Sequence, residues 1–435
     1  MLAKNGIGVE NIKQAIKIPA MLMLCALLAV TSTAASEYTL KVFGNANMDK
    51  TIDHSDVDYV KGVIDGKEKP TQLSDANQDG KVDDEDVAQI ESIMKGDEGY
   101  IFVLDALNRT VKVKEPVNRV VAVKLPIAEA IKAMGAEGKL VGVGTDTINQ
   151  PVLFPDLSRL PSVGGSNLER ADLEKIISLK PDVVFGNEFE KLEQINKLEE
   201  AGITVVSTEC HGDLLNAISA ANRLGYVLGT VKGAEEYTGW YSKYLDEISE
   251  KVKGLSEDEK PRVFYYWNWG EETGPLGTSG KDCPVSKLIG FVGARDLAAE
   301  LPGEYIEADP EWVLKQNPSV AIRELMYLES GYDAENSTAA ERRLRSFENR
   351  SGFADIDAVK KKNDYILAVN ILSDNSWIGT VYLAKLIHPE LFGDLDPMGI
   401  HQEYLTRFQH LDFDVTKQGL FLYPMPDGWQ TKRSS

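Results

Sequence analysis

From residue 100 onward, the chain alternates short apolar runs, which predict strands, with segments of helical periodicity. The first apolar runs lie at residues 120–123, 140–143, 182–185 and 204–206, and helical patterns cover residues 171–180 and 190–201. Such alternation is typical of a parallel sheet with helices on both faces. We therefore predict an α/β lobe over about residues 99–212.

The next segment has an unbroken helical composition over residues 214–228 and 234–252. In the second of these helices Tyr237, Trp240 and Tyr244 recur at three-to-four spacing, which predicts a long amphipathic helix. The alternation restarts with an apolar run at residues 262–266. The predicted fold is thus α/β, with two Rossmann-like lobes, linking helices at about residues 213–254 and a second lobe at about 260–435. A cleft between such lobes is the expected ligand site.

A duplicated twelve-residue loop precedes the first lobe, and its two copies start thirty residues apart. Both copies carry oxygen side chains at positions 1, 3, 5, 9 and 12, which converge on a cation in loops of this type, and position 7 adds its backbone carbonyl. The predicted ion is Ca²⁺. The predicted ligands are Asn45, Asn47, Asp49, Thr51, Asp53 and Asp56 in the first loop, and Asp75, Asn77, Asp79, Lys81, Asp83 and Asp86 in the second.

The two loops differ in ways that favour the second as the stronger Ca²⁺ site. Position 1 is Asn45 in the first loop, which therefore has three carboxylates against four in the second. Lys50 occupies position 6, where Gly normally makes the sharp turn, so a positive φ there would cost on the order of 1 kcal/mol.

Each loop is followed by a helical pattern, at residues 57–64 and 87–94. This pair of loop-helix units resembles the dockerin module, and the resemblance implies a small all-α, calcium-binding domain at residues 37–98. Dockerins bind cohesin modules, so the resemblance also implies a cohesin-bearing surface protein as a partner. A solvated acidic linker is the alternative interpretation.

The N-terminus has the pattern of a secretory signal. Lys4, Lys13 and Lys17 precede an apolar run at residues 18–30, and small residues follow at 33–35. Residues 1–36 are therefore predicted to be a signal peptide, with an uncleaved anchor helix as the alternative. The expected location is secreted or extracytoplasmic and associated with the cell surface.

Charge and cysteine content narrow the function further. The chain has 47 basic and 68 acidic residues and a net charge of -21, which excludes a nucleic-acid partner because phosphate contacts need clustered Lys and Arg. After signal removal Cys210 and Cys283 remain. They predict either one disulfide or two buried thiols.

Motifs over about residues 100 to 410 resemble the substrate-binding proteins of ABC importers for iron chelates and cobalamin. They lie at residues 103–111, 118–121, 167–170, 180–184, 288–296, 309–314 and 317–318. The resemblance implies two lobes joined by a rigid backbone helix. It also implies capture of a metal chelate (an iron siderophore, haem or a corrinoid) for delivery to a permease. Glu169 and Glu311 match the family positions that dock onto permease arginines, contacts that suit exposed carboxylates. Acids that stabilise helix N-termini are the alternative.

We expect the ligand-binding side chains to come from loops that follow strands. Aromatic side chains suit a planar or apolar chelate, and Arg323 suits an anionic one. Aromatic packing between a lobe and the linking helix is the alternative. The predicted residues are Lys124, Asn187 and Glu188 in the first lobe, and Tyr266, Trp267, Asn268, Trp269, Arg323 and Trp377 in the second. A bare transition metal is a poor ligand candidate, since none of the five histidines is paired at helical ligand spacing.

Catalytic signatures are missing from the sequence: it has no G-x-S-x-G, no H-E-x-x-H, no Walker loop and no G-x-G-x-x-G after a strand. The prediction is a binding protein and not an enzyme. The alternative is a dockerin-bearing secreted glycoside hydrolase, in which a pair such as Glu271 and Glu272 would supply carboxylates. That alternative predicts two cleft carboxyls roughly 5 to 10 Å apart.

Overall fold

The computed structural model of the protein describes residues 38–429 except 98, 210–213, 268–273, 281–282 and 304. The predicted signal peptide, Cys210, Asn268 and Trp269 lie outside the described residues, as does the Glu271–Glu272 pair. Residues 36–435 form one compact unit. In the described part of the chain, no helix is both long and apolar enough to cross a membrane.

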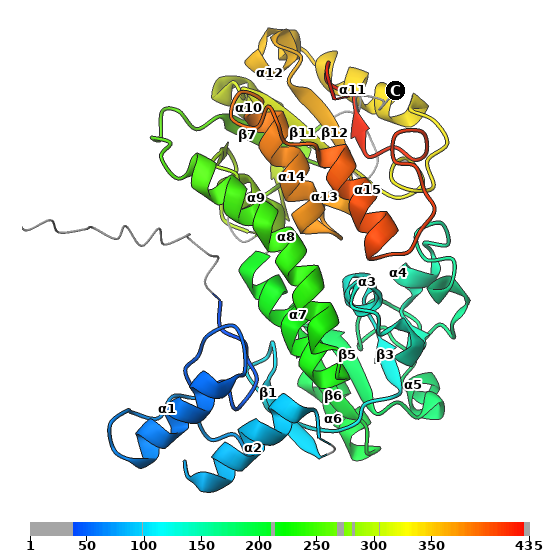
Figure 1. Ribbon diagram of the computed structural model, residues 1–435. Coiled ribbons are helices and arrows are strands. Elements are labelled where there is room, and N and C mark those ends of the chain that lie inside the picture. Colours follow the sequence, from blue (N-terminus) through cyan, green and yellow to red (C-terminus); the bar gives the residue numbers. More distant parts are fainter. Residues whose placement is uncertain are drawn as a thin grey trace, which may run out of the picture. The chain divides into compact units, whose positions relative to one another are not determined.

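Two similar loop-helix units begin the described chain (Figure 1). Their helices are α1 (His54–Ile64) and α2 (Asp84–Lys95). Both start with a capping box, formed by Asp53 with Asp56 and by Asp83 with Asp86. Such a box satisfies free backbone N–H groups at the start of a helix. The predicted helix after each loop is confirmed.

The first lobe contains a four-stranded parallel sheet in the order β4-β3-β5-β6. An antiparallel hairpin precedes it. The strands are β1 (Tyr100–Leu104) and β2 (Thr110–Lys114) in the hairpin, then β3 (Val120–Ala122), β4 (Leu140–Val143), β5 (Val183–Asn187) and β6 (Thr204–Thr208). The helices are α3 (Leu125–Ala133), α4 (Thr145–Ile148), α5 (Leu173–Leu179) and α6 (Leu192–Glu200). The predicted α/β lobe is confirmed.

Two helices then link the lobes, as the amphipathic pattern predicts. They are α7 (Leu214–Leu228) and α8 (Val231–Val252), drawn in green in Figure 1. Helix α8 buries Tyr237, Trp240 and Tyr241. It packs against α7, against α3 of the first lobe and against α14 of the second lobe.

The second lobe has a five-stranded sheet in the order β13-β12-β11-β7-β9, parallel except for β13. Its strands are β7 (Arg262–Tyr266), β9 (Arg295–Asp296), β11 (Val320–Leu325), β12 (Asp364–Ala368) and β13 (Leu422–Tyr423). β8 (Leu276–Ser279) and β10 (Tyr305–Ala308) form a separate antiparallel pair. The helices are α9 (Pro284–Phe291), α10 (Pro310–Gln316), α11 (Thr338–Glu348), α12 (Asp357–Lys360), α13 (Val369–Leu372), α14 (Ser376–Ile387) and α15 (Pro397–Arg407).

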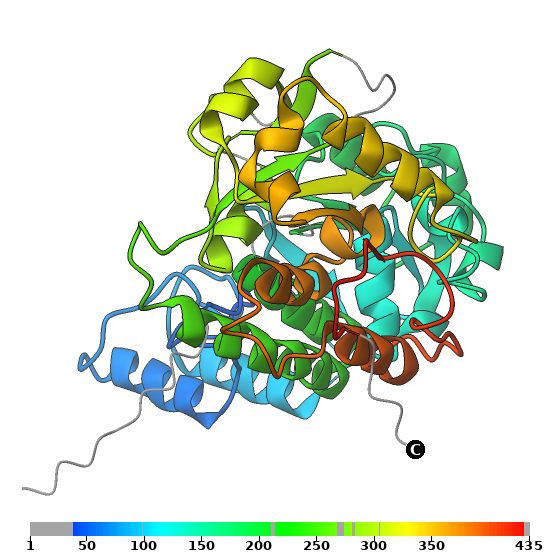
Figure 2. The ribbon, with the colours of Figure 1, turned by 90° about the horizontal axis from the view of Figure 1, so that it is seen from above.

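The loop-helix units and the first lobe share one hydrophobic core. Leu40 and Val42 belong to the same buried cluster as Ile101 and Val103. The backbone N–H of Ile52, within the first loop, donates to the hydroxyl of Tyr226 on α7 at 3.0 Å. Figure 2 shows α1 and α2, in blue, beside the green linking helices. The module predicted at residues 37–98 is therefore packed onto the lobe and is not a separate arm.

Candidate functional site

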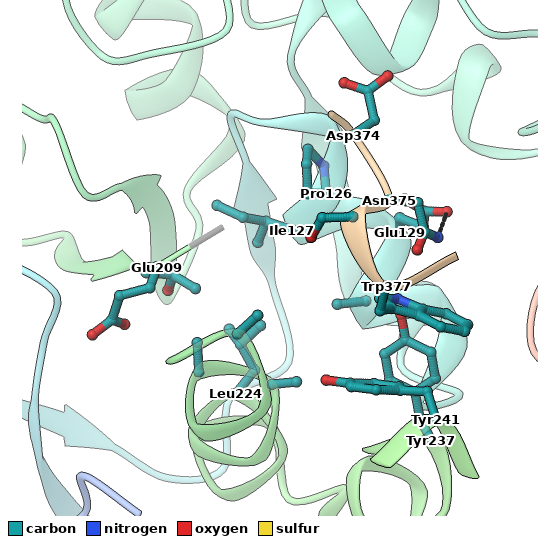
Figure 3. Close-up of a pocket in the computed structure, with 16 residues that line it drawn as sticks. Pro126, Ile127, Glu129, Glu209, Leu224, Tyr237, Tyr241, Asp374, Asn375 and Trp377 are labelled. Carbon is teal, nitrogen blue, oxygen red and sulfur yellow. Dashed lines mark hydrogen bonds between the residues drawn. The ribbon is translucent and has the colours of Figure 1, made fainter. Parts of the chain in front are cut away.

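A cavity lies between α3 of the first lobe, the linking helices α7 and α8, and the turn that leads into α14 of the second lobe (Figure 3). Its volume is about 60 Å³. We call it the interlobe cavity. Its lining residues are Pro126, Ile127, Glu129, Ala130, Thr208, Glu209, Ala217, Ala220, Ala221, Leu224, Tyr237, Tyr241, Asp374, Asn375, Ser376 and Trp377.

One wall of the interlobe cavity is aromatic. Trp377 stacks on Tyr241 with ring centroids 4.7 Å apart and an interplanar angle of 16°. Tyr237 meets the edge of Trp377 at 5.9 Å. The two tyrosines lie on successive turns of α8. Residues four apart share one face of a helix, so both side chains belong to the same wall. All three side chains are buried, at 7% exposed for Trp377, 2% for Tyr241 and 4% for Tyr237, as expected for the alternative of aromatic packing between the second lobe and the linking helix.

Glu129 places a carboxyl group in the cavity wall between the two lobes. It lies on α3 and is only 4% exposed. Its Oε1 accepts hydrogen bonds from Asn375 Nδ2, at 2.9 Å, and from the Tyr404 hydroxyl. Burial raises the pKa of Glu129 to about 7, although these hydrogen bonds oppose the shift. The carboxyl thus ties the first lobe to two elements of the second.

Glu209 follows β6 at the opposite side of the cavity and is ion-paired. Lys41, from the segment before the first loop, lies 2.8 Å from its Oε1, and Arg223 pairs with its Oε2. Burial raises the pKa of Glu209, but the charges of Arg223 and Lys41 outweigh burial and lower the net pKa below its ordinary value. The N-terminal segment therefore supports the cavity wall directly.

Two polar atoms on the cavity lining have no hydrogen-bond partner among the described residues. They are the hydroxyl of Thr208 and the amide oxygen of Asn375. The two residues are 2% and 6% exposed. Buried polar atoms nearly always have partners, so these exceptions point to a bound water or ligand group.

A second cavity adjoins the first through the Tyr327 hydroxyl, which donates to Asp374. Its volume is about 260 Å³, and it lies in the second lobe. Glu324 in its wall accepts hydrogen bonds from Ser373 and from Tyr265, the latter at 2.6 Å. Burial raises the pKa of Glu324 to about 6. Its lining residues are Trp267, Glu324, Leu325, Met326, Tyr327, Glu329 and Arg343.

Comparison with known proteins identifies the family of the chain. The family model described as periplasmic binding protein matches residues 120–368, more than half of the chain and most of both lobes. The chain belongs to the periplasmic binding protein family. The match runs from the start of β3 to the end of β12, so it includes the cavity residues of the first lobe and of the linking helices but not those at positions 374–377.

Individual relatives agree with the family match. The uncharacterized ABC transporter substrate-binding lipoprotein YvrC of Bacillus subtilis is 27% identical over 298 residues, 66% of this chain and 85% of that protein. The molybdate-binding protein MolA of Haemophilus influenzae is 22% identical over 341 residues, 72% of this chain and 91% of MolA. The crystal structure of the TroA-like protein FepB from Veillonella parvula has a TM-score of 0.64 at 22% identity, covering 75% of this chain and 99% of that one. These relatives are binding proteins, and this periplasmic binding protein is not an enzyme.

The predicted ligand-binding residues lie in several places. Trp377 lines the interlobe cavity and Trp267 lines the second one. Lys124 precedes α3, and its ammonium lies 3.7 Å from Asp146. The two remaining residues of the first lobe lie at the end of β5: the side chain of Asn187 accepts from the backbone N–H of Phe189 at 2.8 Å, and Glu188 is half-buried.

The expected positions of Tyr266 and Arg323 are corrected by the structure. Both are 1% exposed. Tyr266 stacks on Phe347 with centroids 4.6 Å apart, and the Arg323 guanidinium lies 5.6 Å from the Tyr266 ring centroid. Side chains alternate between the faces of a strand, so the neighbouring Glu324 lines the second cavity instead, and Tyr265 donates a hydrogen bond to it. The sequence pattern predicts where the strands end, but not on which face of the strand each side chain lies.

Several cavity residues were not anticipated from the sequence, among them Glu129, Thr208 and Glu209. A usable signal existed for Glu129, because it is a lone acid in an otherwise mostly apolar helical segment, residues 125–133. Thr208 and Glu209 end a predicted strand, but no local pattern marks their side chains as cavity residues.

Both predicted docking carboxylates are exposed, one on each lobe. Glu169 Oε1 lies 2.6 Å from the Lys191 ammonium, in an ion pair whose two side chains are 51% and 59% exposed. Glu311 sits in the first turn of α10, and its backbone N–H donates to Asp309. The alternative role as a helix N-terminal acid fits Glu311 but not Glu169, since α5 begins only at Leu173.

The two twelve-residue loops share one hydrogen-bond pattern. In both, the backbone N–H groups of positions 3 and 9 donate to the carboxylate at position 12, at 3.1 and 2.9 Å in the first loop and 3.1 and 2.8 Å in the second. That carboxylate is Asp56 in one loop and Asp86 in the other, and both are fully buried. The structure thus repeats the duplication seen in the sequence.

The first loop differs from the second in how its polar groups are used. Asn47 Nδ2 donates to Asp49 Oδ2 at 2.8 Å, so two of its predicted ligands are bonded to each other. In the second loop the Gly80 N–H donates to Asp75 at 2.9 Å with Gly80 at φ 92. Lys50 does not adopt a positive φ, so the strain expected there is absent. Position 4 has a positive φ in both loops, at Met48 (φ 60) and Gln78 (φ 58). Among the described residues, no group of three or more His, Cys, Asp or Glu is arranged to hold a metal ion.

Proposed function

We propose that this protein is the substrate-binding component of an ABC importer, which captures a metal chelate outside the cytoplasm and delivers it to the permease. The substrate-binding role follows from membership of the periplasmic binding protein family. The chelate class, an iron siderophore, haem or a corrinoid, is our inference from the cavity.

The observation that carries this proposal is the aromatic wall of the interlobe cavity. Trp377 from the second lobe stacks on Tyr241 from the linking helix, so a ligand held there contacts both parts of the molecule. A large, partly apolar ligand with a planar ring or an organic shell gains contact area from such a wall. A small oxyanion, such as the ligand named for MolA, would gain little from it.

The glycoside hydrolase alternative is not favoured. The relatives named above are substrate-binding proteins. In addition, Glu209, one of the cavity carboxylates, is neutralised by Lys41 and Arg223.

Calorimetric titration of the full chain tests the proposed ligand class. Ferric siderophores, haemin and cyanocobalamin are the titrants, and at least one of them is expected to bind with a single site per chain. Binding of none of them would contradict the proposed function.

The N-terminal loops are proposed to bind two Ca²⁺ ions, with the second loop the stronger site. Their donor set consists of carboxylate, amide, hydroxyl and backbone oxygens, which are the ligands that Ca²⁺ prefers. When bound, the ions would neutralise the buried Asp56 and Asp86. We further propose that this dockerin-like module holds the protein at the cell surface through a cohesin-bearing partner, because positions 10 and 11 of both loops (His54, Ser55, Asp84 and Glu85) are exposed.

Glu169 and Glu311 are proposed to dock onto permease arginines. Glu169→Ala and Glu311→Ala are each expected to reduce chelate uptake by whole cells roughly tenfold, because a lost charge-assisted contact is worth on the order of 1.4 kcal/mol. Calorimetry should show unchanged chelate affinity for both variants, with Glu200→Ala, an exposed acid on α6, as the control. Reduced affinity would place the two carboxylates in the ligand site instead.

A further inference from the structure

The charged side chains that line the interlobe cavity are acidic. Three of its lining residues carry carboxyl groups, Glu129, Glu209 and Asp374, whereas none of the described lining residues is Lys, Arg or His. Lys41 and Arg223 lie behind Glu209 and pair with it, so their charges are already matched.

Asn375, at the cavity lining, carries an acceptor that has no partner among the described residues. Its Nδ2 donates to Glu129 at 2.9 Å, which fixes the orientation of the amide, and Figure 3 shows this bond. The remaining oxygen, Oδ1, belongs to a side chain that is 6% exposed and has no partner among the described residues. A carbonyl oxygen can be satisfied only by a donor.

Thr208 supplies the second unpartnered group. Thr208 is the last residue of β6 and is 2% exposed. Its hydroxyl has no hydrogen-bond partner among the described residues. Leaving such a group unsatisfied costs free energy, which a ligand can recover by bonding to it. The two groups come from different lobes, so a ligand that bonds to both would bridge the cavity.

We propose that the part of the chelate buried in this cavity is an edge that carries hydrogen-bond donors, namely amide, amine or hydroxyl groups. This inference rests on the proposed function and narrows its ligand class. A chelate that presents carboxylates or an oxyanion here would face acceptors of the same sign without a lining cation to compensate, so the cavity discriminates against it.

A panel of four probes tests the inference by calorimetry on the full chain. Two bear donors, cyanocobalamin with its amides and ferrioxamine B with its ammonium and amides. Two are anionic, ferric citrate and molybdate. We expect a donor-bearing probe to bind at least tenfold more tightly than either anionic probe. Preferential binding of ferric citrate, or binding of none of the four, would overturn the inference and leave the chelate importer to the haemin titration, whereas preferential binding of molybdate would overturn both.

Thr208→Val tests the site itself. The substitution removes the hydroxyl at nearly constant volume, so we expect roughly tenfold weaker binding of the selected probe with no loss of thermal stability, because the hydroxyl has no protein partner to lose. Thr208→Ser should restore most of the affinity. Thr204→Val, at the start of the same strand, is the matched control. Unchanged affinity in Thr208→Val, or lost stability in place of lost affinity, would show that the hydroxyl does not contact the ligand.

Discussion

Glu129 shows how a single side chain can serve both the cavity and the contact between lobes. It is buried, bonded to Asn375 and Tyr404 of the second lobe, and its pKa is raised by burial to about 7 against an ordinary value of 4.5. The folded protein therefore holds the proton more tightly than the unfolded chain does. The contribution of Glu129 to the free energy of unfolding is fully present below pH 4.5 and is lost as the pH rises through 7.

Glu129→Gln should reduce this dependence on pH. For the native carboxyl, the pKa shift corresponds to a fall in the free energy of unfolding of about 3 kcal/mol at most between pH 5 and 8. Because Gln does not ionise, urea denaturation of the variant should show a smaller fall over the same range. Glu200→Gln, an exposed acid on α6, is the control and should follow the native protein. An identical pH dependence in Glu129→Gln and the native protein would contradict the assigned pKa.

The sequence predicts the helices and strands of this fold, but not the face of a strand on which each side chain lies. The alternation of apolar runs predicts the strands well because buried parallel strands require continuous apolar residues. It cannot distinguish Tyr265 from Tyr266, since both neighbours lie in such a run. The contact between Lys41 and Glu209 joins residues 168 positions apart, so no local pattern could reveal it.

At the scale of elements, that ion pair fastens the N-terminal module to the first lobe. Lys41→Met should lower the free energy of unfolding by about 1 to 3 kcal/mol, since it leaves a largely buried carboxylate with one partner fewer. Lys67→Met is the matched control: its ion pair with Asp65 is exposed to solvent, so its loss should leave the stability essentially unchanged. Equal effects of the two substitutions in urea denaturation would contradict a fastening role for Lys41.

The paired loops make a second prediction at this scale. Ca²⁺ should raise the midpoint of thermal unfolding of the full chain, with a gain in stability of about 2.7 kcal/mol when Ca²⁺ exceeds its Kd 100-fold. Asp86→Ala should remove more of this gain than Asp56→Ala, because the first loop already uses Asn47 and Asp49 to bond each other. Differential scanning calorimetry with and without EDTA measures both. A thermal midpoint that does not respond to Ca²⁺ would contradict the calcium assignment.

At the scale of the whole molecule, the linking helices turn two lobes into one binding site. Helix α8 contributes Tyr237 and Tyr241, α3 contributes Glu129, and the second lobe contributes Asn375 and Trp377 to a single cavity. None of these elements could form the site alone.

The most direct test is a crystal structure of the full chain bound to whichever chelate the calorimetric titrations select. The account predicts electron density for the chelate in the interlobe cavity, with its ring or organic shell against Trp377 and Tyr241 and a donor group within hydrogen-bond distance of Thr208 or Asn375. A chelate bound elsewhere on the protein, with the interlobe cavity filled only by water, would contradict it.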